Sequence, residues 1–358
     1  MKSFSGDIRA NRGIILAEKQ VEEQYAATPS TLLDVARAAG VSASTVSRIL
    51  NGTAKVSEAK RLKVLDAIER MNFTPNHMAQ NLKSGHSMTI GIVVQDISSP
   101  FFDEALRGVD DGLKGTGYTS VIVSGHWNAE EEEDRIRLLL ARKVDGIILL
   151  SGRISDEAVV RFSNRRPIVS TGRNIHTKNS IGFKIDNEYG AFIAVNHLIQ
   201  LGHRRIAFVA GPANNTDAGE RMKGYQRALA EANIAQDDNL IVEGDFHEAC
   251  GLIAVNHLFE TRQQFTAIFA ANDLSAYGVR LGLYRKGIRV PDDISLVGFD
   301  DLPGSAYTAP PLTTVHQPLY DIGRIATHTL LGIISGTESH WEVPPLELVV
   351  RETTRPLR

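Results

Sequence analysis

The sequence predicts an α/β protein in which a small all-α module at the N-terminus precedes a larger body built on two Rossmann-like parallel sheets. Its 358 residues, 42% of them hydrophobic, exceed what one compact unit usually holds, so two or three domains are expected. Residues 31–90 carry a net charge of +4 and the residues after them −7, which sets a basic module apart from an acidic body. From Met88 onward, short apolar runs alternate with amphipathic stretches, a pattern typical of parallel strands and their covering helices.

Composition and motif content exclude several classes of protein. No run approaches the ~20 apolar residues that span a bilayer, and the apolar patch at 14–17 ends at Glu18, too short for an export signal. We therefore expect a cytoplasmic protein with no membrane partner. The single Cys250 cannot form an internal disulfide or hold zinc by itself, so we expect a buried, unreactive thiol. The acidic run at 130–134 is interpreted as the solvated start of a helix rather than a metal site.

The start of the basic module has the features of a helix-turn-helix. Thr31 and Asp34 have the spacing of a capping box that begins a first helix, and Ser42 can cap a second. Gly40 lies where the chain must turn, and the small Ala36 lets the two helices cross closely. A shared apolar face is expected from Val35, Ala39, Val41, Val46 and Ile49. A plain helical hairpin is the alternative, but this combination of features favours DNA binding.

In a helix-turn-helix the second helix enters the major groove with its N-terminus first. Ala43, Ser44 and either Ser47 or Arg48 would then face the base edges. An arginine can form two hydrogen bonds with guanine, so Arg48 is the best candidate for a base-specific contact, with a phosphate contact as the alternative. The sequence thus predicts double-stranded DNA as a partner.

Two further helices are expected after the helix-turn-helix. The segment 57–71 has apolar residues at helical spacing, and Ser57 can cap it. Asn76 can cap a shorter helix over 76–83, but two turns are marginal alone in water, so this segment needs a partner to persist.

These motifs resemble the DNA-binding headpiece and hinge of the lac repressor and purine repressor (LacI/GalR) family. The matching residues are 45–48, Asn51, 56–57, 75–76 and 79–82. The resemblance implies a headpiece over 31–74 and a hinge helix with linker over 75–87. It also implies that Leu82 wedges into the minor groove and kinks the duplex, with packing in the protein's own core as the alternative. The residues then expected to contact DNA are Thr31, Ser42, Ala43, Ser44, Thr45, Ser47, Arg48, Asn51, Asn76, Ala79, Leu82 and Lys83.

Two features depart from the family pattern. Ala43 and Ser44 are small where relatives often carry larger or more polar residues, so direct reading at those base pairs is expected to be weak. Residues 1–30 have no counterpart in that pattern, and their mixed charge predicts a disordered extension.

Seven apolar runs predict strands in the body. They are 90–94, 120–124, 146–150, 168–170, 206–210, 267–270 and 294–298. About a dozen alternating elements exceed one sheet, so two lobes are expected. Because ligands bind beyond the carboxyl ends of parallel strands, the residues just after each run are candidates for a binding site.

The candidates chosen in this way combine aromatic rings with Asp, Asn, Gln and Arg. They are Asp96, Phe101, Phe102, Arg173, Arg221, Phe246, Asn272, Asp300 and Gln317. A sugar stacks its C–H faces on rings and needs polar partners for its hydroxyls, so their convergence predicts a sugar-binding cleft. The same rule also selects Asp273 beside Asn272 and Asp301 beside Asp300. Taken singly, these residues have plainer alternatives: a helix cap for Asp273 or Asp301, and a core ring for Phe101 or Phe246.

Over essentially its full length the body resembles the type I periplasmic-binding-protein-like effector domain of the same family. The matching stretches are 202–206, 211–212, 271–273, 291–295, 298–300 and 311–315. The resemblance implies an effector and dimerisation domain over 88–358, with a lobe boundary near 187–190 and the chain recrossing near 317 and 343.

The resemblance also implies roles for individual residues. Arg221, Asn272, Asp300 and Gln317 would hold sugar hydroxyls, while Phe102 and Phe246 would sandwich the ligand. Arg173 matches a position used by ribose-type binding proteins, but Gly172 stands where those often carry an acid, which argues against a simple ribose ligand.

These features indicate a regulator that binds a palindromic operator as a homodimer. By resemblance it is a repressor, and a sugar or sugar derivative between the lobes would move the hinge segments and so set DNA affinity. The sequence contains no phosphate loop, zinc-protease motif or nucleophile elbow, so neither enzyme activity nor a metal or cofactor is expected.

Alternatives from other classes are a sugar transport protein, which the basic headpiece and missing export signal disfavour, and a sugar-processing enzyme. The chain ends without an apolar heptad tail, which favours dimers over tetramers. The identity and sign of the effector and the genes controlled stay open.

Overall fold

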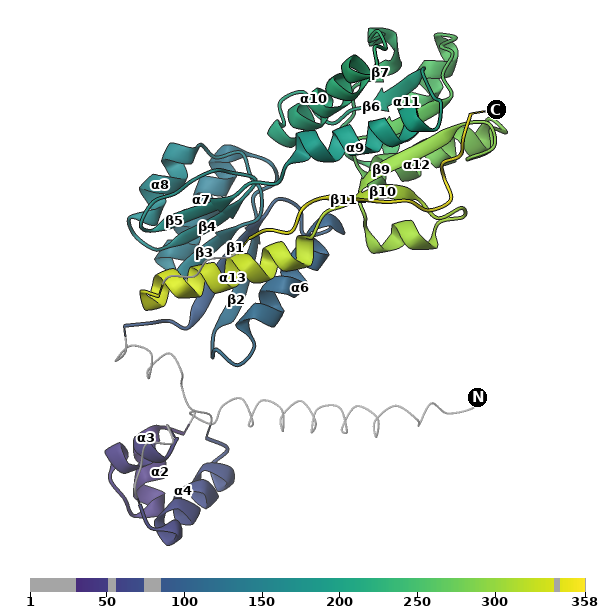
Figure 1. The fold of residues 1–358 in the computed structure, drawn as a ribbon. Helices are drawn as coiled ribbons and strands as arrows, with labels where there is room; N and C mark the ends of the chain where they lie inside the picture. The colour runs from purple at the N-terminus through teal and green to yellow at the C-terminus, as the bar shows by residue number, and fades with distance from the viewer. Residues whose placement is uncertain (1–29, 51–55, 74–84, 338–341, 358) are drawn as a thin grey trace, which may run out of the picture. The chain divides into compact units, whose positions relative to one another are not determined.

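A computed structural model describes residues 30–50, 56–73, 85–337 and 342–357 (Figure 1). The chain forms two compact units that divide between Gly85 and His86. The predicted fold class is confirmed: the first unit is helical in its described part, and the second is α/β with two sheets. No helix in the described ranges has both the length and the apolar character to cross a lipid bilayer.

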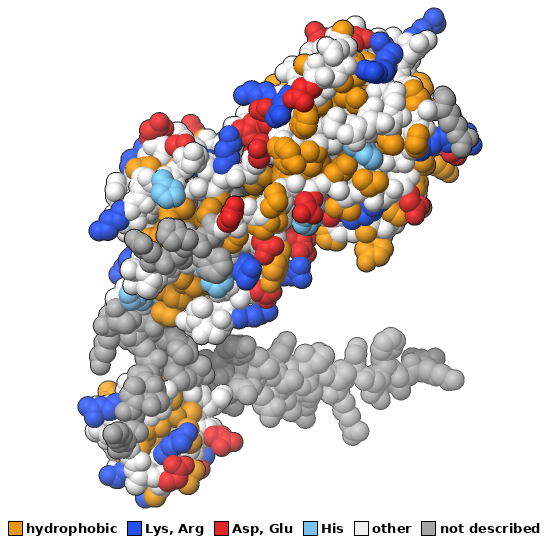
Figure 2. Space-filling model, viewed as in Figure 1, with side chains coloured by type: hydrophobic (Ala, Val, Ile, Leu, Met, Phe, Trp, Pro, Cys, Tyr) orange, Lys and Arg blue, Asp and Glu red, His pale blue; other side chains and the backbone are white. Residues whose placement is uncertain are grey.

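The first unit, the headpiece, contains α2 (Leu32–Ala39), α3 (Ala43–Leu50) and α4 (Glu58–Arg70) in its described part. Gly40 ends α2 at φ 65°, a left-handed conformation that favours glycine, as the sequence predicted. The three helices close on one small apolar core, made of Val35, Ala36, Ala39, Val46, Val64, Ala67 and Phe73. Figure 2 shows both basic and acidic side chains on the visible face of this unit.

The predicted capping hydrogen bonds are present at the start of α2 but not at the start of α4. The capping box of α2 is formed: the Asp34 N–H donates to Thr31 Oγ1 over 3.3 Å, and the Thr31 N–H donates to the Asp34 carboxylate over 3.0 Å. Ser57 lies at the N-cap position of α4, but its side chain makes no capping hydrogen bond, so that part of the prediction is wrong.

The N-terminal lobe of the second unit holds a parallel sheet in the order β2-β1-β3-β4-β5. Its strands are β1 (Thr89–Val94), β2 (Thr119–Ser124), β3 (Gly146–Leu149), β4 (Ile168–Thr171) and β5 (Ser180–Phe183). In this register Ile92 lies opposite Ile122 on one side and Ile148 on the other. Successive side chains of a strand point to opposite faces, so each face of the sheet carries its own apolar cluster, and helices cover both clusters.

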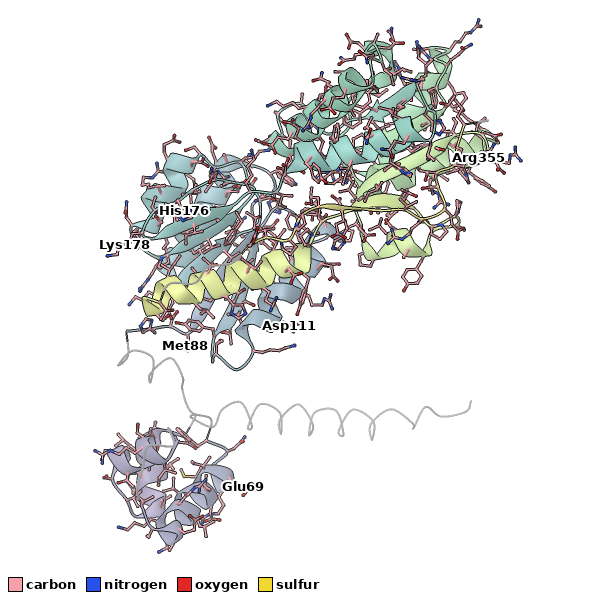
Figure 3. The ribbon with its side chains drawn as sticks, viewed as in Figure 1. Glu69, Met88, Asp111, His176, Lys178 and Arg355 are labelled. Carbon is pink, nitrogen blue, oxygen red and sulfur yellow. The ribbon has the colours of Figure 1, made fainter. Side chains whose placement is uncertain are left out.

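Two pairs of helices cover this sheet. The first face packs against α6 (Phe101–Leu113) and α13 (Leu319–Ser335), which lie side by side in Figure 1. Asp111 of α6, labelled in Figure 3, accepts a hydrogen bond from the Tyr320 hydroxyl of α13 over 2.8 Å. The other face packs against α7 (Ala129–Ala141) and α8 (Asp156–Ser163). A helix from the end of the chain thus completes the first lobe.

The C-terminal lobe holds a sheet in the order β11-β10-β9-β8-β6-β7. Its strands are β6 (Ile206–Val209), β7 (Ile241–Val242), β8 (Ala267–Ala270), β9 (Ser295–Asp300), β10 (Thr313–His316) and β11 (Glu347–Val349). The prediction of a parallel sheet holds for every strand here except β11, which runs antiparallel to β10. The chain returns to this lobe only after α13, and its last strand adds to an open edge, where antiparallel strands are common.

Helices cover both faces of this sheet as well. One face packs against α9 (Asn187–Gln200) and α10 (Thr216–Glu231), and the other against α11 (Glu248–Glu260) and α12 (Asp273–Arg285). The short helices η1 (Asp238–Leu240) and η2 (Pro303–Tyr307) lie in connections.

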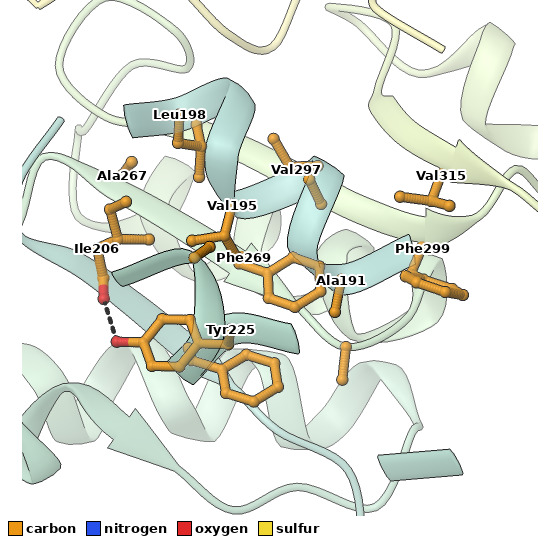
Figure 4. Close-up of a cluster of buried hydrophobic side chains, with 14 of the residues drawn as sticks. Ala191, Val195, Leu198, Ile206, Tyr225, Ala267, Phe269, Val297, Phe299 and Val315 are labelled. Atoms are coloured by element: carbon orange, nitrogen blue, oxygen red, sulfur yellow. Dashed lines mark hydrogen bonds between the residues drawn. The ribbon is translucent and has the colours of Figure 1, made fainter. Parts of the chain in front are cut away.

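Aromatic side chains fill the core under α9 and α10 (Figure 4). The rings of Tyr225, Phe208 and Phe269 stack in turn, with centroids 5.0 and 4.9 Å apart. The buried Tyr225 hydroxyl donates to the Ile206 carbonyl over 2.9 Å, so its polar end is satisfied. This packing fixes β6 and β8, whose carboxyl ends point toward the other lobe.

The chain passes between the lobes three times. It crosses after β5 ends at Phe183, again at Gln317 between β10 and α13, and a third time between α13 and β11. The last residues then pack on the C-terminal lobe, where Arg355 donates to Asp292 over 2.7 Å (Figure 3). Three crossings place the carboxyl ends of both sheets on either side of one cleft.

Candidate functional site

The exposed side of α3 is the candidate DNA-reading surface of the headpiece. Ser42, Ser44 and Arg48 are exposed, while Val46 is buried in the core. Ser42 caps the helix as predicted, since its Oγ accepts from the Thr45 N–H over 3.2 Å and lies 2.9 Å from Ser44 Oγ. The short side chains leave this end of the helix accessible, and helix N-termini attract phosphate.

The other residues expected to contact DNA lie in α3, at the start of α2, or outside the described residues. Ala43, Thr45 and Ser47 lie half-buried in α3. Thr31 caps α2, and its hydroxyl hydrogen bond to Asp34 lowers the pKa of that carboxyl. Lying outside the described residues are Asn51, Asn76, Ala79, Leu82 and Lys83, together with all of the predicted N-terminal extension except Ser30.

In the second unit a cavity of about 340 Å³, the aromatic cavity, lies between the lobes at the carboxyl ends of the strands. Seven of the nine predicted effector residues line it, namely Asp96, Phe101, Phe102, Arg221, Phe246, Asn272 and Asp300. The first three follow β1 in the N-terminal lobe, and the other four belong to the C-terminal lobe. The Phe101 and Phe102 rings meet edge to face, with centroids 5.2 Å apart.

Arg221 is a buried cation in the C-terminal wall, only 4% exposed. Its Nε donates to Asn187 Oδ1 over 2.9 Å, and its Nη1 donates to the Ala271 carbonyl over 2.5 Å and lies 3.6 Å from Asp300 Oδ1. The guanidinium also lies over the Phe299 ring, 3.8 Å from its centroid. Burial lowers the pKa of Arg221, although neighbouring carboxylates oppose that shift. These contacts fix the side chain in one position.

Asp300, the last residue of β9, is the partner of this cation. It is 3% exposed and has φ 122°, a conformation that residues other than glycine rarely adopt. Gln317 Nε2 donates to its carboxylate over 2.6 Å. Burial raises the pKa of Asp300, and the nearby Arg221 charge opposes that shift. Polar side chains buried this deeply require their hydrogen bonds, because each loses its hydration.

Asn272 has a structural role in addition to lining the cavity. It is the N-cap of α12, because its Oδ1 accepts from the Ser275 N–H over 3.0 Å, and its Nδ2 donates to the Phe246 carbonyl over 2.8 Å. The amide therefore joins α12 to the loop that carries Phe246. One N–H and one lone pair of the amide remain for a ligand.

Asp273 and Asp301, for which a helix cap was the alternative, do not cap the helices that follow them, because Asn272 is the N-cap of α12 and Leu302 that of η2. Asp273 is fully buried and accepts a hydrogen bond from Thr314 Oγ1 over 2.6 Å, and burial raises its pKa. Asp301 forms an ion pair with Arg351 over 2.7 Å and lies 3.0 Å from His316 Nδ1. Both carboxylates therefore connect strands and loops of the C-terminal lobe.

Arg173 and Gln317 lie outside the aromatic cavity and line its neighbours. Gln317 is buried and lines a small adjoining cavity. Arg173 lines a second cavity of about 850 Å³, the polar cavity, and its Nη1 donates to Asp156 over 2.8 Å. The aromatic and polar cavities share Trp127 and Arg153 among their lining residues.

Several lining residues were missed from the sequence. Trp127 follows the carboxyl end of β2 and Arg153 follows that of β3, so the strand-end rule could have found both. Asp217 lies in the first turn of α10, where that rule gives no signal. The Asn187 amide donates to it over 3.1 Å, and burial raises its pKa.

Glu132 corrects the interpretation of 130–134 as a solvated helix start. The run does begin α7, but the Glu132 side chain is buried. Its carboxylate accepts from the Arg153 N–H over 2.8 Å and the Ile154 N–H over 3.2 Å, and burial raises its pKa. Glu132 thus holds the loop from which Arg153 reaches the other lobe, donating to Asn214 over 2.9 Å.

Neither a metal centre nor a reactive thiol is apparent in the described part of the chain. There, no three His, Cys, Asp or Glu side chains are grouped so as to hold a metal ion. Cys250 is buried, as predicted, and its Sγ–H donates to the His247 carbonyl over 3.0 Å. Burial raises the pKa of this thiol, which disfavours the reactive thiolate.

Comparison with known families agrees with both units. Residues 31–76 match the model described as bacterial regulatory proteins of the lacI family, and residues 195–354 match the periplasmic binding protein-like domain. The HTH-type transcriptional repressor PurR of Vibrio atlanticus is 36% identical over 333 residues, covering 92% of this chain and 99% of that protein. Catabolite control protein A of Priestia megaterium is 39% identical over 305 residues, covering 84% and 91%.

Solved structures agree as well. A lac repressor dimer bound to operator and the anti-inducer ONPF has a TM-score of 0.81 and 30% identity, covering 92% of this chain and all of that one. A complex of the transcriptional regulator CelR with cellobiose has a TM-score of 0.66 and 33% identity, covering 90% and 99%. Identity and coverage of this extent show that the chain belongs to the lacI family of bacterial transcriptional regulators.

Proposed function

We propose that this chain is a ligand-responsive repressor that binds a palindromic operator as a homodimer, with its affinity set by a sugar or sugar derivative between the lobes. The aromatic cavity carries the proposal. It combines three phenylalanine rings and a tryptophan, contributed by both lobes, with buried Arg, Asn and Asp side chains of the C-terminal lobe. Rings suit the C–H faces of a sugar, and fixed polar groups suit its hydroxyls.

The exposed side of α3 supports the DNA-binding half of the proposal. Ser44, Ser47 and Arg48 would face base edges in the major groove. The roles of Asn51 and of the hinge residues Asn76, Ala79, Leu82 and Lys83 rest on the family resemblance. The lac repressor relative is described as bound to operator, which is consistent with these roles.

Exposed apolar side chains support a homodimer. Ile253 on α11 is 64% exposed, and Tyr284 on α12 is 79% exposed. Both lie on the outer side of the helix layer that covers one face of the C-terminal sheet. Large apolar side chains exposed on one layer are compatible with a surface that a partner covers, and a second copy of the chain is the partner that the dimeric relative suggests.

The effector would act through the three crossings between the lobes. A ligand that contacts both lobes favours one closure angle, which shifts the segments that lead to the hinge. The size of the effect equals the difference in ligand affinity between the two states, typically about 1–3 kcal/mol.

Selection of DNA by the purified chain tests the proposal. We would incubate it with a library of random palindromic duplexes, with and without a panel of sugars. We expect one palindrome to be enriched and one sugar to change its retention. Failure to hold any duplex tightly, whatever the sugar or salt concentration, would contradict a regulatory function.

We also propose that the chain is not an enzyme and acts in the cytoplasm, where operator DNA lies. The relatives named above are transcriptional regulators. Conversion of a bound sugar into a product on long incubation with the chain would contradict this.

A further inference from the structure

We propose that the cleft binds an uncharged ligand of at least two sugar units, one in the aromatic cavity and the next in the polar cavity beside Arg173. This inference rests on the proposed function, because it names the class of effector for the same site. Three observations carry it: the two cavities adjoin, the polar cavity offers donors and space for a second unit, and the lining is acidic.

The two cavities form one continuous cleft. They share Trp127, Ser151, Arg153, Asn215 and Asp217, which come from both lobes. The aromatic cavity, at about 340 Å³, lies at the low end of the range of roughly 300–1,000 Å³ for ligand pockets. The polar cavity has about 850 Å³. A single sugar ring in the first would leave the second vacant.

Trp127 lies where the two cavities join. Its backbone has φ 54°, and its N–H donates to Oε1 of the buried Gln95 over 3.1 Å. Gln95 also donates from Nε2 to the Ser151 carbonyl over 3.3 Å, so one side chain fixes both the tryptophan loop and the loop after β3. A ring held at this junction can stack on the sugar at the link between two units.

Arg173 and Gly172 provide the donors and the space for the second unit. The Arg173 side chain is 10% exposed, and within the described structure only Nη1 is bonded, to Asp156. Its buried Nε has no hydrogen-bond partner. Gly172 has φ 74°, and no heavy atom lies within 4 Å of the position that a Cβ would occupy. The acid that the ribose-type pattern places there is thus replaced by open space.

The charge of the cleft disfavours anionic ligands. Among the described residues that line the two cavities, eight are Asp or Glu and four are Arg or Lys. Three of the four cations already face a carboxylate: Arg173 pairs with Asp156 over 2.8 Å, Lys184 with Glu220 over 2.7 Å, and Arg221 lies 3.6 Å from Asp300. Burial raises the pKa of Asp217 and Asp300, but the other six carboxylates still outnumber the four cations, so a phosphate or carboxylate on the ligand would meet an excess of negative charge.

Calorimetric titration of the full chain tests the inference. The probes are cellobiose, maltose, lactose and sucrose, their constituents glucose, galactose and fructose, and glucose 6-phosphate with sucrose 6-phosphate. We expect one neutral disaccharide to bind at least about tenfold more tightly than its own constituents or any phosphorylated sugar. A monosaccharide that binds as tightly, or a phosphorylated sugar that binds more tightly, would overturn the inference and leave the proposed function standing.

Absence of binding to every sugar would also overturn it. Operator selection by the same preparation would then show separately whether the DNA-binding function stands.

Two variants with matched controls locate the second unit and the charge effect. Arg173→Gln should lower disaccharide affinity about tenfold or more without changing monosaccharide affinity, whereas Arg161→Gln, on the exposed side of α8 in the same lobe, should change neither. Glu248→Gln should raise affinity for the phosphorylated sugars several-fold, whereas Glu260→Gln, at the far end of the same helix, should not. Equal effects of a variant and its control would contradict the placement.

Discussion

The buried side chains of Arg221 and Asp300, 3.6 Å apart, tie ligand binding to the stability of the C-terminal lobe. Both side chains line the aromatic cavity, yet both are buried and bonded to other parts of the lobe. Replacing Arg221 leaves the Asn187 and Ala271 oxygens buried without the donor that each has in the intact chain, which is a costly change for a protein interior.

We therefore expect Arg221→Ala to reduce the free energy of unfolding by about 3–5 kcal/mol in addition to abolishing sugar binding. Urea denaturation followed by circular dichroism measures this. Arg227→Ala is the control, because Arg227 lies on the same helix but is exposed and paired with Glu231 over 2.9 Å. Its unfolding midpoint should not change; similar losses in both variants would contradict a special role for the buried pair.

Asp300 should also give the stability a specific dependence on pH. Because burial raises its pKa, the folded state holds this proton more tightly than the unfolded state. The stability contributed by this group is fully present below the pKa of an unfolded aspartate, about 4, and is lost as the pH rises through the higher folded pKa. The free energy of unfolding of the unmodified chain should thus fall more steeply between pH 4 and neutral pH than that of Asp300→Asn.

Asp293 is a control, because its pKa is shifted in the direction opposite to that of Asp300. Hydrogen bonds from Arg289 lower its pKa to about 2. Its contribution is present above the pKa of an unfolded aspartate and is lost as the pH falls toward 2. Asp293→Asn should therefore change the free energy of unfolding only at acidic pH. If the free energy of unfolding of Asp300→Asn and of the unmodified chain depended on pH in the same way, the account of Asp300 would be contradicted.

At the scale of single elements, the recognition helix makes the clearest prediction for DNA. Arg48→Ala should relax discrimination at one base pair of the selected operator by about 1–3 kcal/mol, because a bidentate contact to guanine is lost. Binding to single-base operator variants measures this. If Arg48 instead contacts phosphate, affinity would fall equally for all sequences and the salt dependence would weaken.

Helix pairs within the lobes approach through glycines. In α6 and α13, a Cβ on Gly108 would lie 2.0 Å from the Tyr320 carbonyl oxygen, and one on Gly323 would lie 2.0 Å from that of Ala105. Gly323→Ala should therefore destabilise the chain by about 1–3 kcal/mol or more in urea denaturation. Gly219→Ala in α10 is the control, since nothing lies within 4 Å of its Cβ position, and it should be neutral or slightly stabilising. Loss of stability in both would contradict the steric explanation.

The sequence predicted seven strands but not β5, β7, β10 or β11. Strands such as β1, β3, β6 and β8 are apolar runs buried on both faces, which give a strong signal, whereas β2 was found from its apolar centre although it is largely exposed. β10 contains Thr313 and Thr314, which are fully buried because their hydroxyls bond to partners such as Asp273. Tertiary partners of this kind, and short edge strands such as β7, leave no periodic signal in the sequence.

At the scale of the whole molecule, much of the site could be predicted because parallel sheets present their carboxyl ends to one cleft. That rule, with the family resemblance, gathered seven residues of one cavity from distant parts of the chain. It could not divide the cleft into an aromatic and a polar cavity, because that depends on Trp127 and on Arg153 reaching across to Asn214. Contacts between loops of different lobes appear only in the folded chain.

The central claim is that a sugar between the lobes and an operator at the headpiece influence each other's binding. Fluorescence anisotropy of a labelled selected operator, titrated with the chain at saturating and at zero sugar, tests it most directly. We expect the Kd for operator to change by roughly 5- to 150-fold, and the Kd for sugar to change by the same factor when operator is bound. Identical operator affinities with and without a sugar that calorimetry shows to be bound would contradict the account.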